Sequence, residues 1–301
     1  MPTTNTGSLS RRSARDAPSP APVPRTAEEV RSTLGGLGLR PSRAWGQSFL
    51  VDPFVADAEA ALVEARPGRA VVEIGGGLGL LTAALVRRGV EPLTVVERDP
   101  RLAAFLRNSF GPRIRLVEGD ALTVPLPDAD CVIGNLPFSV GTPILERLLG
   151  ARTPSIVFLL QKEVTERIAS PPGSRQYGRL SIFARLYGSV ELHRTVPADA
   201  FWPRPEVDGR IAVHRARPGP LPVPSVGELE RAVRVLFTGR RKQLGNLLPQ
   251  LGGSREGAAT LAAAAGWPDD WARLRPENLP PESFFALARA LEEPSRSGAR
   301  R

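Results

Sequence analysis

Cysteine and histidine are scarce in this chain of 301 residues. It has one cysteine, Cys131, and two histidines, His193 and His214. A single cysteine excludes an intramolecular disulfide, and we expect Cys131 to be a buried apolar residue within a strand. Three such residues are too few for a His/Cys metal cluster, and they disfavour a histidine-based catalytic triad. This count does not exclude a carboxylate-bound Mg²⁺, but no residue spacing calls for one, and we expect no metal ion at the functional site.

Long apolar runs are also missing. No segment approaches the roughly 18 apolar residues that a membrane-spanning helix needs. No stretch near the N-terminus resembles the apolar core of a signal peptide. We therefore expect a cytoplasmic protein that does not associate with a membrane.

Positive charge is in excess, and arginine carries almost all of it. Lys+Arg number 40 against 31 Asp+Glu, which gives a net charge of +9 and an isoelectric point near 11. Lys162 and Lys242 are the only lysines. The excess favours a polyanionic partner, most simply nucleic acid, although an arginine-rich proteome would produce the same composition.

Composition divides the chain into five segments. Residues 1–26 are rich in Ser, Thr, Arg and Pro, which predicts a disordered basic tail. Residues 27–217 carry both strand and helix patterns, and a stiff proline-rich linker follows at 218–224. Residues 225–294 show only helical periodicity and are expected to form a small RNA-binding domain. A second basic tail is expected at 295–301.

The segment 27–217 alternates β-branched runs with amphipathic helical patterns. This alternation predicts an α/β fold with a doubly wound, mainly parallel sheet. The expected strands span residues 70–74, 93–96, 114–117, 132–135, 156–160, 190–196 and 210–215. The main helices are expected at 27–36, 53–65, 80–88, 143–149, 162–169 and 177–187. Ligands of such folds bind at the carboxyl ends of the strands.

A glycine-rich turn follows the first strand. Glu73, Gly75, Gly77 and Gly79 form the pattern E-x-G-x-G-x-G, in which the glycines allow positive φ and close approach of a ligand. The dinucleotide fingerprint would need its third glycine where Leu80 stands. The pattern instead looks like the S-adenosylmethionine (SAM) site of class I methyltransferases, which have a Rossmann-like sheet.

Acidic residues follow the next two strands. Glu97 ends the second strand, where a carboxylate would accept hydrogen bonds from the ribose hydroxyls of the cofactor. Asp120 ends the third strand and is placed to accept from the adenine amine. Either acid alone is more often a solvated loop residue. The glycine turn after the first strand, Glu97 after the second and Asp120 after the third together favour a SAM site.

The fourth strand ends in Asn135-Leu136-Pro137-Phe138. The Asn135 amide oxygen and the Leu136 carbonyl can accept hydrogen bonds from an exocyclic amine, while the Phe138 ring can stack on a base. Pro137 holds the direction of the carbonyl. The stretch therefore predicts chemistry on the amino group of a planar heterocycle. The alternative is an ordinary strand-ending turn with a packed phenylalanine.

Eight separate motifs resemble those of the rRNA adenine N6-methyltransferases. They are GQSFL (46–50), EIGGGLG (73–79), NLPF (135–138), LQKEV (160–164), YGRLS (177–181), FWPRPEVD (201–208), RRK (240–242) and LRPENL (274–279). Together they look like the KsgA/RsmA branch, whose members dimethylate two adjacent adenines near the 3′ end of small-subunit (16S) rRNA during ribosome maturation. The similarity runs from about residue 40 to residue 293.

The resemblance implies SAM as the methyl donor and a set of residues that contact it. These are Gln47, Ser48, Leu50, Gly75, Gly77, Glu97, Asp120, Ala121 and Asn135. It implies that Asn135, Leu136, Pro137 and Phe138 act on the target adenine. It also implies a partner, the immature small ribosomal subunit. We further expect a monomer.

Three residues depart from the family pattern. Ser48 replaces the usual Asn or His, which puts one cofactor contact in question. Gly76 stands where bacterial members often have proline, which should loosen the turn. Phe138 replaces the more common tyrosine, so a ring can still stack but a phenol hydrogen bond is lost.

Basic side chains outside the strand ends are the candidates for RNA binding. Arg240, Arg241 and Lys242 form a cluster in the helical segment, and Arg179 is a further candidate. A run of three positive charges is more often only a solvated surface.

Two other functions stay open. One is an Erm-like methyltransferase that acts on large-subunit rRNA, and the other is a non-catalytic assembly factor that kept the fold. The RRK and LRPENL motifs favour the small-subunit branch. The presence of Gly75, Glu97, Asp120 and Asn135 argues against loss of chemistry.

Overall fold

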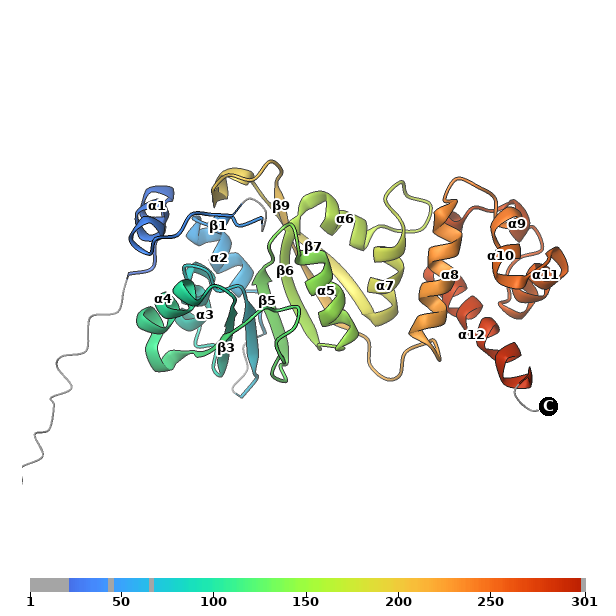
Figure 1. Cartoon of the computed structure of the whole chain (residues 1–301), viewed down its shortest axis with the longest axis horizontal. Coiled ribbons are helices and arrows are strands. Elements are labelled where there is room, and N and C mark those ends of the chain that lie inside the picture. The colour runs from blue at the N-terminus through green and yellow to red at the C-terminus, as the bar shows by residue number, and fades with distance from the viewer. Residues whose placement is uncertain (1–21, 43–45, 65–67, 299–301) are drawn as a thin grey trace, which may run out of the picture.

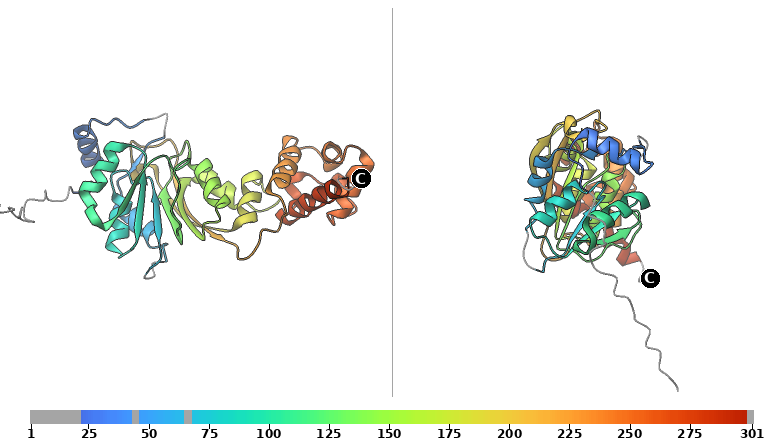
Figure 2. Two further views of the ribbon diagram at one scale, coloured as in Figure 1. Left: turned by 60° about the horizontal axis from the view of Figure 1, so that its bottom comes forward. Right: turned by 90° about the vertical axis from the view of Figure 1, so that its left-hand side faces the viewer.

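A computed structural model describes residues 22–42, 46–64 and 68–298 of the chain. The molecule is elongated, with a strand-and-helix domain at one end and a domain of helices only at the other (Figures 1 and 2). Most of the expected first tail lies outside the described residues. Within its last part, Thr26 caps the first helix, α1 (Ala27–Gly36), by accepting from the Glu29 amide.

A seven-stranded sheet organises the first domain. Its order is β4-β3-β2-β5-β6-β9-β7, with β4 (Arg115–Glu118), β3 (Leu93–Glu97), β2 (Val71–Ile74), β5 (Cys131–Asn135), β6 (Ser155–Gln161), β9 (Gly209–Ala216) and β7 (Gly188–Val196). The first five of these are mutually parallel. β9 runs antiparallel to both β6 and β7. The predicted mainly parallel α/β sheet is therefore confirmed.

Apolar residues on both faces explain why the sheet is covered on both sides. In β5, Cys131 and Ile133 belong to one buried cluster, whereas Val132 belongs to another, because successive side chains of a strand point to opposite faces. One cluster includes residues of α2 (Pro53–Ala60) and α3 (Leu80–Arg87). The other includes residues of α5 (Gly141–Gly150) and α7 (Arg179–Tyr187).

The helix α2 is shorter than the periodicity predicts, since it ends at Ala60 rather than near residue 65. The Leu62 amide donates to the Glu59 carbonyl and the Val63 amide to the Ala60 carbonyl. Such bonds across three residues tighten a last turn and end a helix. The helix α7 also differs from the expectation: it begins at Arg179, two residues later than expected, with Gly178 as its N-cap.

A second, two-stranded sheet was not predicted. β1 (Phe49–Leu50) pairs antiparallel with β8 (Phe201–Trp202), so that Leu50 lies opposite Phe201. Two residues are too few to show an alternating pattern in the sequence. The pairing ties the segment after residue 46 to a loop that comes about 150 residues later in the chain.

The second domain contains α8 (Val226–Thr238), α9 (Leu244–Leu247), α10 (Pro249–Gly252), α11 (Arg255–Ala264) and α12 (Pro281–Gly298). Its buried residues continue the cluster under α5 and α7. α12 includes residues 295–298, which were expected in the second tail. The sequence of α12 contains Pro294, which lacks a backbone N–H, but the residues after it continue the helix. Among the described residues, no helix is long and apolar enough to cross a bilayer.

Candidate active site

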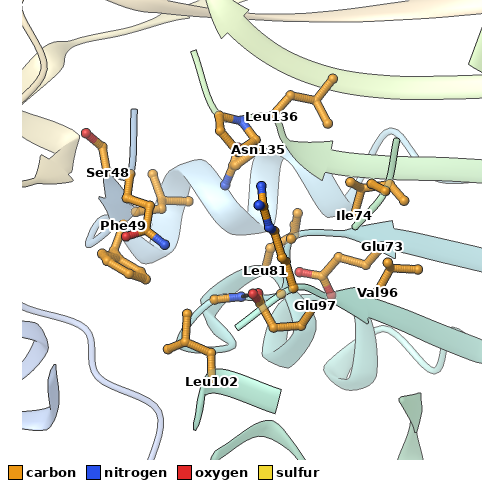
Figure 3. A pocket seen from close by; sticks show the side chains of 18 of the residues that line it. Ser48, Phe49, Glu73, Ile74, Leu81, Val96, Glu97, Leu102, Asn135 and Leu136 are labelled. Atoms are coloured by element: carbon orange, nitrogen blue, oxygen red, sulfur yellow. Dashed lines mark hydrogen bonds between the residues drawn. The ribbon is translucent and has the colours of Figure 1, made fainter. Parts of the chain in front are cut away.

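A cavity of about 1300 Å³, including the part open to solvent, lies at the carboxyl ends of β2, β3 and β5. The twelve residues expected to contact cofactor or base all line it: Gln47, Ser48, Leu50, Gly75, Gly77, Glu97, Asp120, Ala121, Asn135, Leu136, Pro137 and Phe138. Figure 3 shows Ser48 and Phe49 on one side of the cavity, Glu73 and Ile74 across from them, and Asn135 between. Parallel strands bring these ends to one edge of the sheet.

The glycine turn lies at the floor of the cavity. Gly75, Gly77 and Gly79 have φ of 77°, 54° and 83°, which side chains with a Cβ rarely adopt. A Cβ on Gly76 would lie 2.5 Å from a Val95 methyl carbon and 2.8 Å from one of Leu106. The turn therefore fits tightly on the core behind it and leaves its other side open to a ligand.

Glu97 holds this turn in place. One carboxylate oxygen accepts from the Gly77 amide at 2.9 Å, and the other accepts from the Asp99 amide at 2.9 Å. The Gly77 amide is thus already used by Glu97, which leaves close approach of the backbone, rather than the N–H, as what Gly77 offers a ligand. A carboxylate has about four acceptor positions, so Glu97 can also accept from a ribose hydroxyl. Burial raises the pKa of Glu97, against the backbone amides that lower it.

Asp120 lies at the rim of the cavity. One of its oxygens accepts from the Leu122 amide at 2.9 Å, and the other lies 3.2 Å from Arg98 Nη1. Arg147 of α5 donates to the carbonyls of Ala121 and Val124, the second at 2.7 Å. Helix α5 therefore holds the turn after β4, which carries Asp120 and Ala121, the residues expected to meet the adenine of the cofactor.

Glu73 is a cavity residue whose position sequence reasoning left without a role. It is 1% exposed, and one of its oxygens accepts from the Thr82 hydroxyl at 2.7 Å. Burial raises its pKa to about 8, although the Thr82 hydroxyl lowers it. Glu59 of α2 is also fully buried, and burial together with the charge of Glu73 raises its pKa well above the usual value.

The segment that contains Gln47 and Ser48 reaches the cavity because β1 pairs with β8. The Gln47 side-chain oxygen accepts from the Ser42 amide at 2.9 Å, which closes the loop before β1. Phe49 and Phe201 also line the cavity and were not predicted as site residues. Phe201 begins the FWPRPEVD motif, but its strand β8 has only two residues, which is too short for a sequence pattern that would predict its position in the cavity.

The end of β5 carries the groups expected to meet a base. Asn135 Oδ1 is buried and has no hydrogen-bond partner among the described residues. Leu136 is 3% exposed and belongs to the apolar cluster, so its backbone carbonyl is the one hydrogen-bond acceptor that this residue offers. The Pro137 carbonyl accepts from the Val140 and Gly141 amides at 3.1 and 2.7 Å. Phe138 packs edge-to-face on Phe201, with ring centroids 6.5 Å apart.

These features fit a positively charged nucleoside cofactor such as SAM. Asn135 Oδ1, which has no partner within the described part of the chain, and the carboxylates of Glu97 and Asp120 supply acceptors, and the glycine turn supplies room. Among the residues that the structure describes, no group of three or more His, Cys, Asp or Glu could hold a metal ion.

The predicted RNA-binding residues lie outside this cavity, and two of them are already paired. Arg179 donates to a Glu146 carboxylate at 2.7 Å and lies over the Phe183 ring. Arg240 pairs with Glu277 at 2.7 Å. Arg241 and Lys242 are exposed.

The sequence is similar to that of known rRNA methyltransferases. The model of the ribosomal RNA adenine dimethylase family matches residues 39–264. The chain is 38% identical over 265 residues to the probable ribosomal RNA small subunit methyltransferase A of Natronomonas pharaonis, covering 85% of this chain and 95% of that protein. The ribosomal RNA small subunit methyltransferase A of Deinococcus radiodurans is 38% identical over 291 residues, which are 92% of this chain and 96% of that protein.

Solved structures agree with this similarity. A dimethyladenosine transferase from Plasmodium falciparum has the same fold, with a TM-score of 0.68 and 22% identity over 83% of this chain and 98% of that one. The 23S rRNA methyltransferase ErmE gives a TM-score of 0.59 and 27% identity, covering 81% of this chain and 99% of that one. Because the family model matches most of the sequence, the chain belongs to the ribosomal RNA adenine dimethylase family.

Proposed function

We propose that this enzyme methylates adenine N6 in small-subunit rRNA at the end of β5, through Asn135, Leu136, Pro137 and Phe138. SAM is the methyl donor, and the substrate is two adjacent adenines near the 3′ end of that RNA. The observation that carries the site assignment is the buried Asn135 oxygen, which has no hydrogen-bond partner among the described residues. An adenine amine would satisfy it.

The target base must leave its stack to reach the cavity. The Phe138 ring would stack on it, and a stacking platform of this kind contributes about 1–3 kcal/mol. Edge-to-face packing on Phe201 holds the Phe138 ring in place. The base would therefore meet a surface that is already oriented.

The adenine N6 is a poor nucleophile because its lone pair is delocalised into the ring. The Asn135 side-chain oxygen and the Leu136 carbonyl would accept the two N6–H groups and so direct the lone pair into the cavity. Pro137 and the two amides that bind its carbonyl keep this part of the chain rigid. When bound, SAM supplies a methyl group on a sulfonium, which is a good leaving group, so positioning supplies much of the rate. The methylated N6 would be positively charged and acidic, so its proton would pass to water and no strong base is required.

The cofactor would lie against the glycine turn. Glu97 would accept from the ribose hydroxyls, and Asp120 would accept from the adenine amine of the cofactor. Gln47, Ser48, Leu50 and Ala121 would complete its contacts, together with Gly75, Gly77 and Asn135. All these residues line one cavity, which supports the assignment.

The 38% identical relatives, which are named small subunit methyltransferases, favour that subunit over the large one. We assign the exposed Arg241 and Lys242 to RNA binding, whereas Arg240 and Arg179, also expected to bind RNA, are paired with Glu277 and Glu146. We further infer a monomeric, cytoplasmic enzyme that acts on immature small subunits. The excess of positive charge supports an RNA partner.

Incubation with labelled SAM and unmethylated ribosomal subunits, large and small in separate reactions, tests this function. We expect label only in the small subunit, as N6-methylated adenine. Label in the large subunit would show an Erm-like specificity. No label in either would favour the non-catalytic assembly factor.

A further inference from the structure

Arg240 is held between two parts of the chain. It follows the end of α8, and its Nε donates to a Glu277 carboxylate oxygen at 2.7 Å. Its Nη2 donates to the Ser174 carbonyl at 3.0 Å. Ser174 belongs to the loop between α6 (Lys162–Ala169) and α7, whereas Glu277 lies in a 3-10 turn (Pro276–Asn278) of the helical domain. One guanidinium thus joins the two domains.

A second hydrogen bond follows the same route. The Gly173 amide donates to the backbone carbonyl of Glu277 at 2.6 Å. Glu277 therefore binds the loop between α6 and α7 with its backbone and binds Arg240 with its side chain. Figure 1 shows this loop reaching the end of α8.

The burial of this pair sets it apart from an ordinary surface ion pair. The side chains of Arg240 and Glu277 are 33% and 23% exposed. Water screens such a charge pair only in part, and a planar guanidinium fixes direction as well as charge. A phosphate could use Arg240 only by displacing Glu277 or by approaching its negative charge.

Aromatic rings make the apolar part of the same contact. Tyr177, just after the loop, packs edge-to-face on Phe237 of α8 with centroids 6.3 Å apart, and Phe237 packs on Phe284 of α12 at 5.8 Å. Apolar contact holds surfaces together without strong directional preference, whereas hydrogen bonds depend on angle. The polar contacts of Arg240 are thus the part of this junction that can select one orientation.

The loop is also connected to the cavity. β6 contributes Leu159 to the cavity lining, α6 follows β6 directly, and the loop follows α6. The loop is therefore joined, through α6 and β6, to the strand that forms one edge of the cavity. The exposed Arg241 and Lys242 come directly after Arg240.

We propose that Arg240 is a positioning residue which, with Glu277 and Ser174, fixes the orientation of the helical domain relative to the cavity. It thereby sets the separation between the cavity and the basic residues that follow it. Its effect on methylation rests on the proposed function, whereas its effect on domain orientation does not.

A distance measurement in the full chain tests the orientation directly. Spin labels are attached at Ala104→Cys on α4 (Pro100–Phe110) and Ala259→Cys on α11, both of which replace exposed alanines. Cys131 is buried, so the labels react at the introduced positions. The distance distribution should broaden in both Arg240→Lys and Glu277→Gln. Arg241→Ala is the contrast and should leave it narrow.

Arg240→Lys and Glu277→Gln also separate orientation from phosphate contact. Lysine keeps the positive charge but loses the fork that reaches two partners, and glutamine leaves the arginine charge free. Orientation predicts that both substitutions lower kcat/KM on small subunits by about tenfold, the effect of losing one charge-assisted hydrogen bond. The dissociation constant for SAM and the salt dependence of RNA binding should not change. The double variant should be no worse than either single one.

Unchanged distance distributions in both variants would overturn the proposal. So would tighter RNA binding by Glu277→Gln together with normal behaviour of Arg240→Lys, because that pair of results defines a phosphate contact. If Arg240→Lys fails to fold, the distance distribution of Glu277→Gln alone tests whether the Arg240–Glu277 contact fixes the domain orientation. If no protein sample methylates the small subunit, the proposed function fails, and the distances still decide the role of Arg240.

Discussion

A buried oxygen without a hydrogen-bond partner costs free energy unless a ligand supplies the donor. Asn135 Oδ1 is in this position among the described residues, at the end of a central strand and beside the Phe138 ring. The chain thus keeps an amide where an apolar side chain of similar size would stabilise the fold more. The cost is explained if an exocyclic amine binds there.

Asn135→Ala removes this acceptor. We expect methyl transfer to small subunits to fall by tenfold or more, since one lost hydrogen bond corresponds to about 1.4 kcal/mol. Single-turnover methylation with labelled SAM measures the rate, and calorimetry measures the affinity for SAM. Asn108→Ala, an exposed asparagine of α4, is the matched control. A fall of less than tenfold with normal SAM binding would remove the amide from the mechanism.

The buried acid Glu73 makes stability depend on pH. Its pKa in the folded chain is about 8, above the usual glutamate value of 4.5, so the folded state favours the protonated form. Its contribution to stability is therefore fully present below pH 4.5 and is lost as pH rises through 8. Glu59, whose pKa is also raised, acts in the same direction.

Glu73→Gln keeps the shape and removes the titration. We expect the free energy of unfolding of this variant to fall less between pH 5 and pH 9 than that of the original chain. Urea unfolding at several pH values measures the difference. Some dependence should persist because Glu59 still titrates. If the free energy of unfolding changes with pH to the same extent in both proteins, Glu73 is not protonated in the folded state at neutral pH.

At the scale of elements, the cavity depends on contacts between segments far apart in the sequence. β1 brings Ser48 and Leu50 to the cavity by pairing with β8, which also brings Phe201. On the other side, Arg147 of α5 binds the carbonyls of Ala121 and Val124 and so holds the turn after β4. Helix and strand packing therefore positions the loops that would contact the cofactor.

Arg147→Met keeps the apolar stem and removes both hydrogen bonds of the guanidinium. We expect the dissociation constant for SAM to rise by about tenfold, because hydrogen bonds from charged groups are each worth roughly 1.5–3 kcal/mol and part of this loss would loosen the turn. Calorimetry with SAM measures the change. Arg234→Met, at an exposed arginine of α8, is the control. Unchanged SAM affinity would show that the turn keeps its form without Arg147.

At the scale of the whole molecule, the strands whose ends line the cavity belong to one domain, and α8, which precedes the exposed basic residues, belongs to the other (Figure 1). RNA that reaches both must span the junction at α7 and α8. The orientation of the two domains is then part of substrate recognition, which is why the contacts of Arg240 matter as much as its charge.

Neutralisation of Arg241 or Lys242 tests the electrostatic part of RNA binding. Each substitution by alanine should lower the slope of log affinity against log salt by about 1, the value for one lost phosphate contact. Binding of small-subunit RNA between low and moderate salt measures the slope. Unchanged slopes for both variants would place the RNA contact elsewhere.

The sequence by itself determined the fold class, the positions of most strands along the chain and twelve of the residues that line the cavity. Strand periodicity and strand-end residues are local features, and parallel strands bring their ends together whatever the details of packing. For this reason Gly75, Glu97, Asp120 and Asn135 could be brought to one cavity from the sequence alone. The family motifs then pointed to adenine in RNA.

Only the tertiary structure decided which charged groups are free and which are paired. Arg240 and Arg241 are neighbours of the same type in the sequence, yet one is bound to Glu277 and the other is exposed. Likewise Glu73 and Glu97 both follow β-branched residues and both are buried, but Glu73 accepts from the Thr82 hydroxyl whereas Glu97 accepts from backbone amides. Burial and pairing depend on residues distant in the chain, as the short β1–β8 sheet does, and no local pattern encodes them.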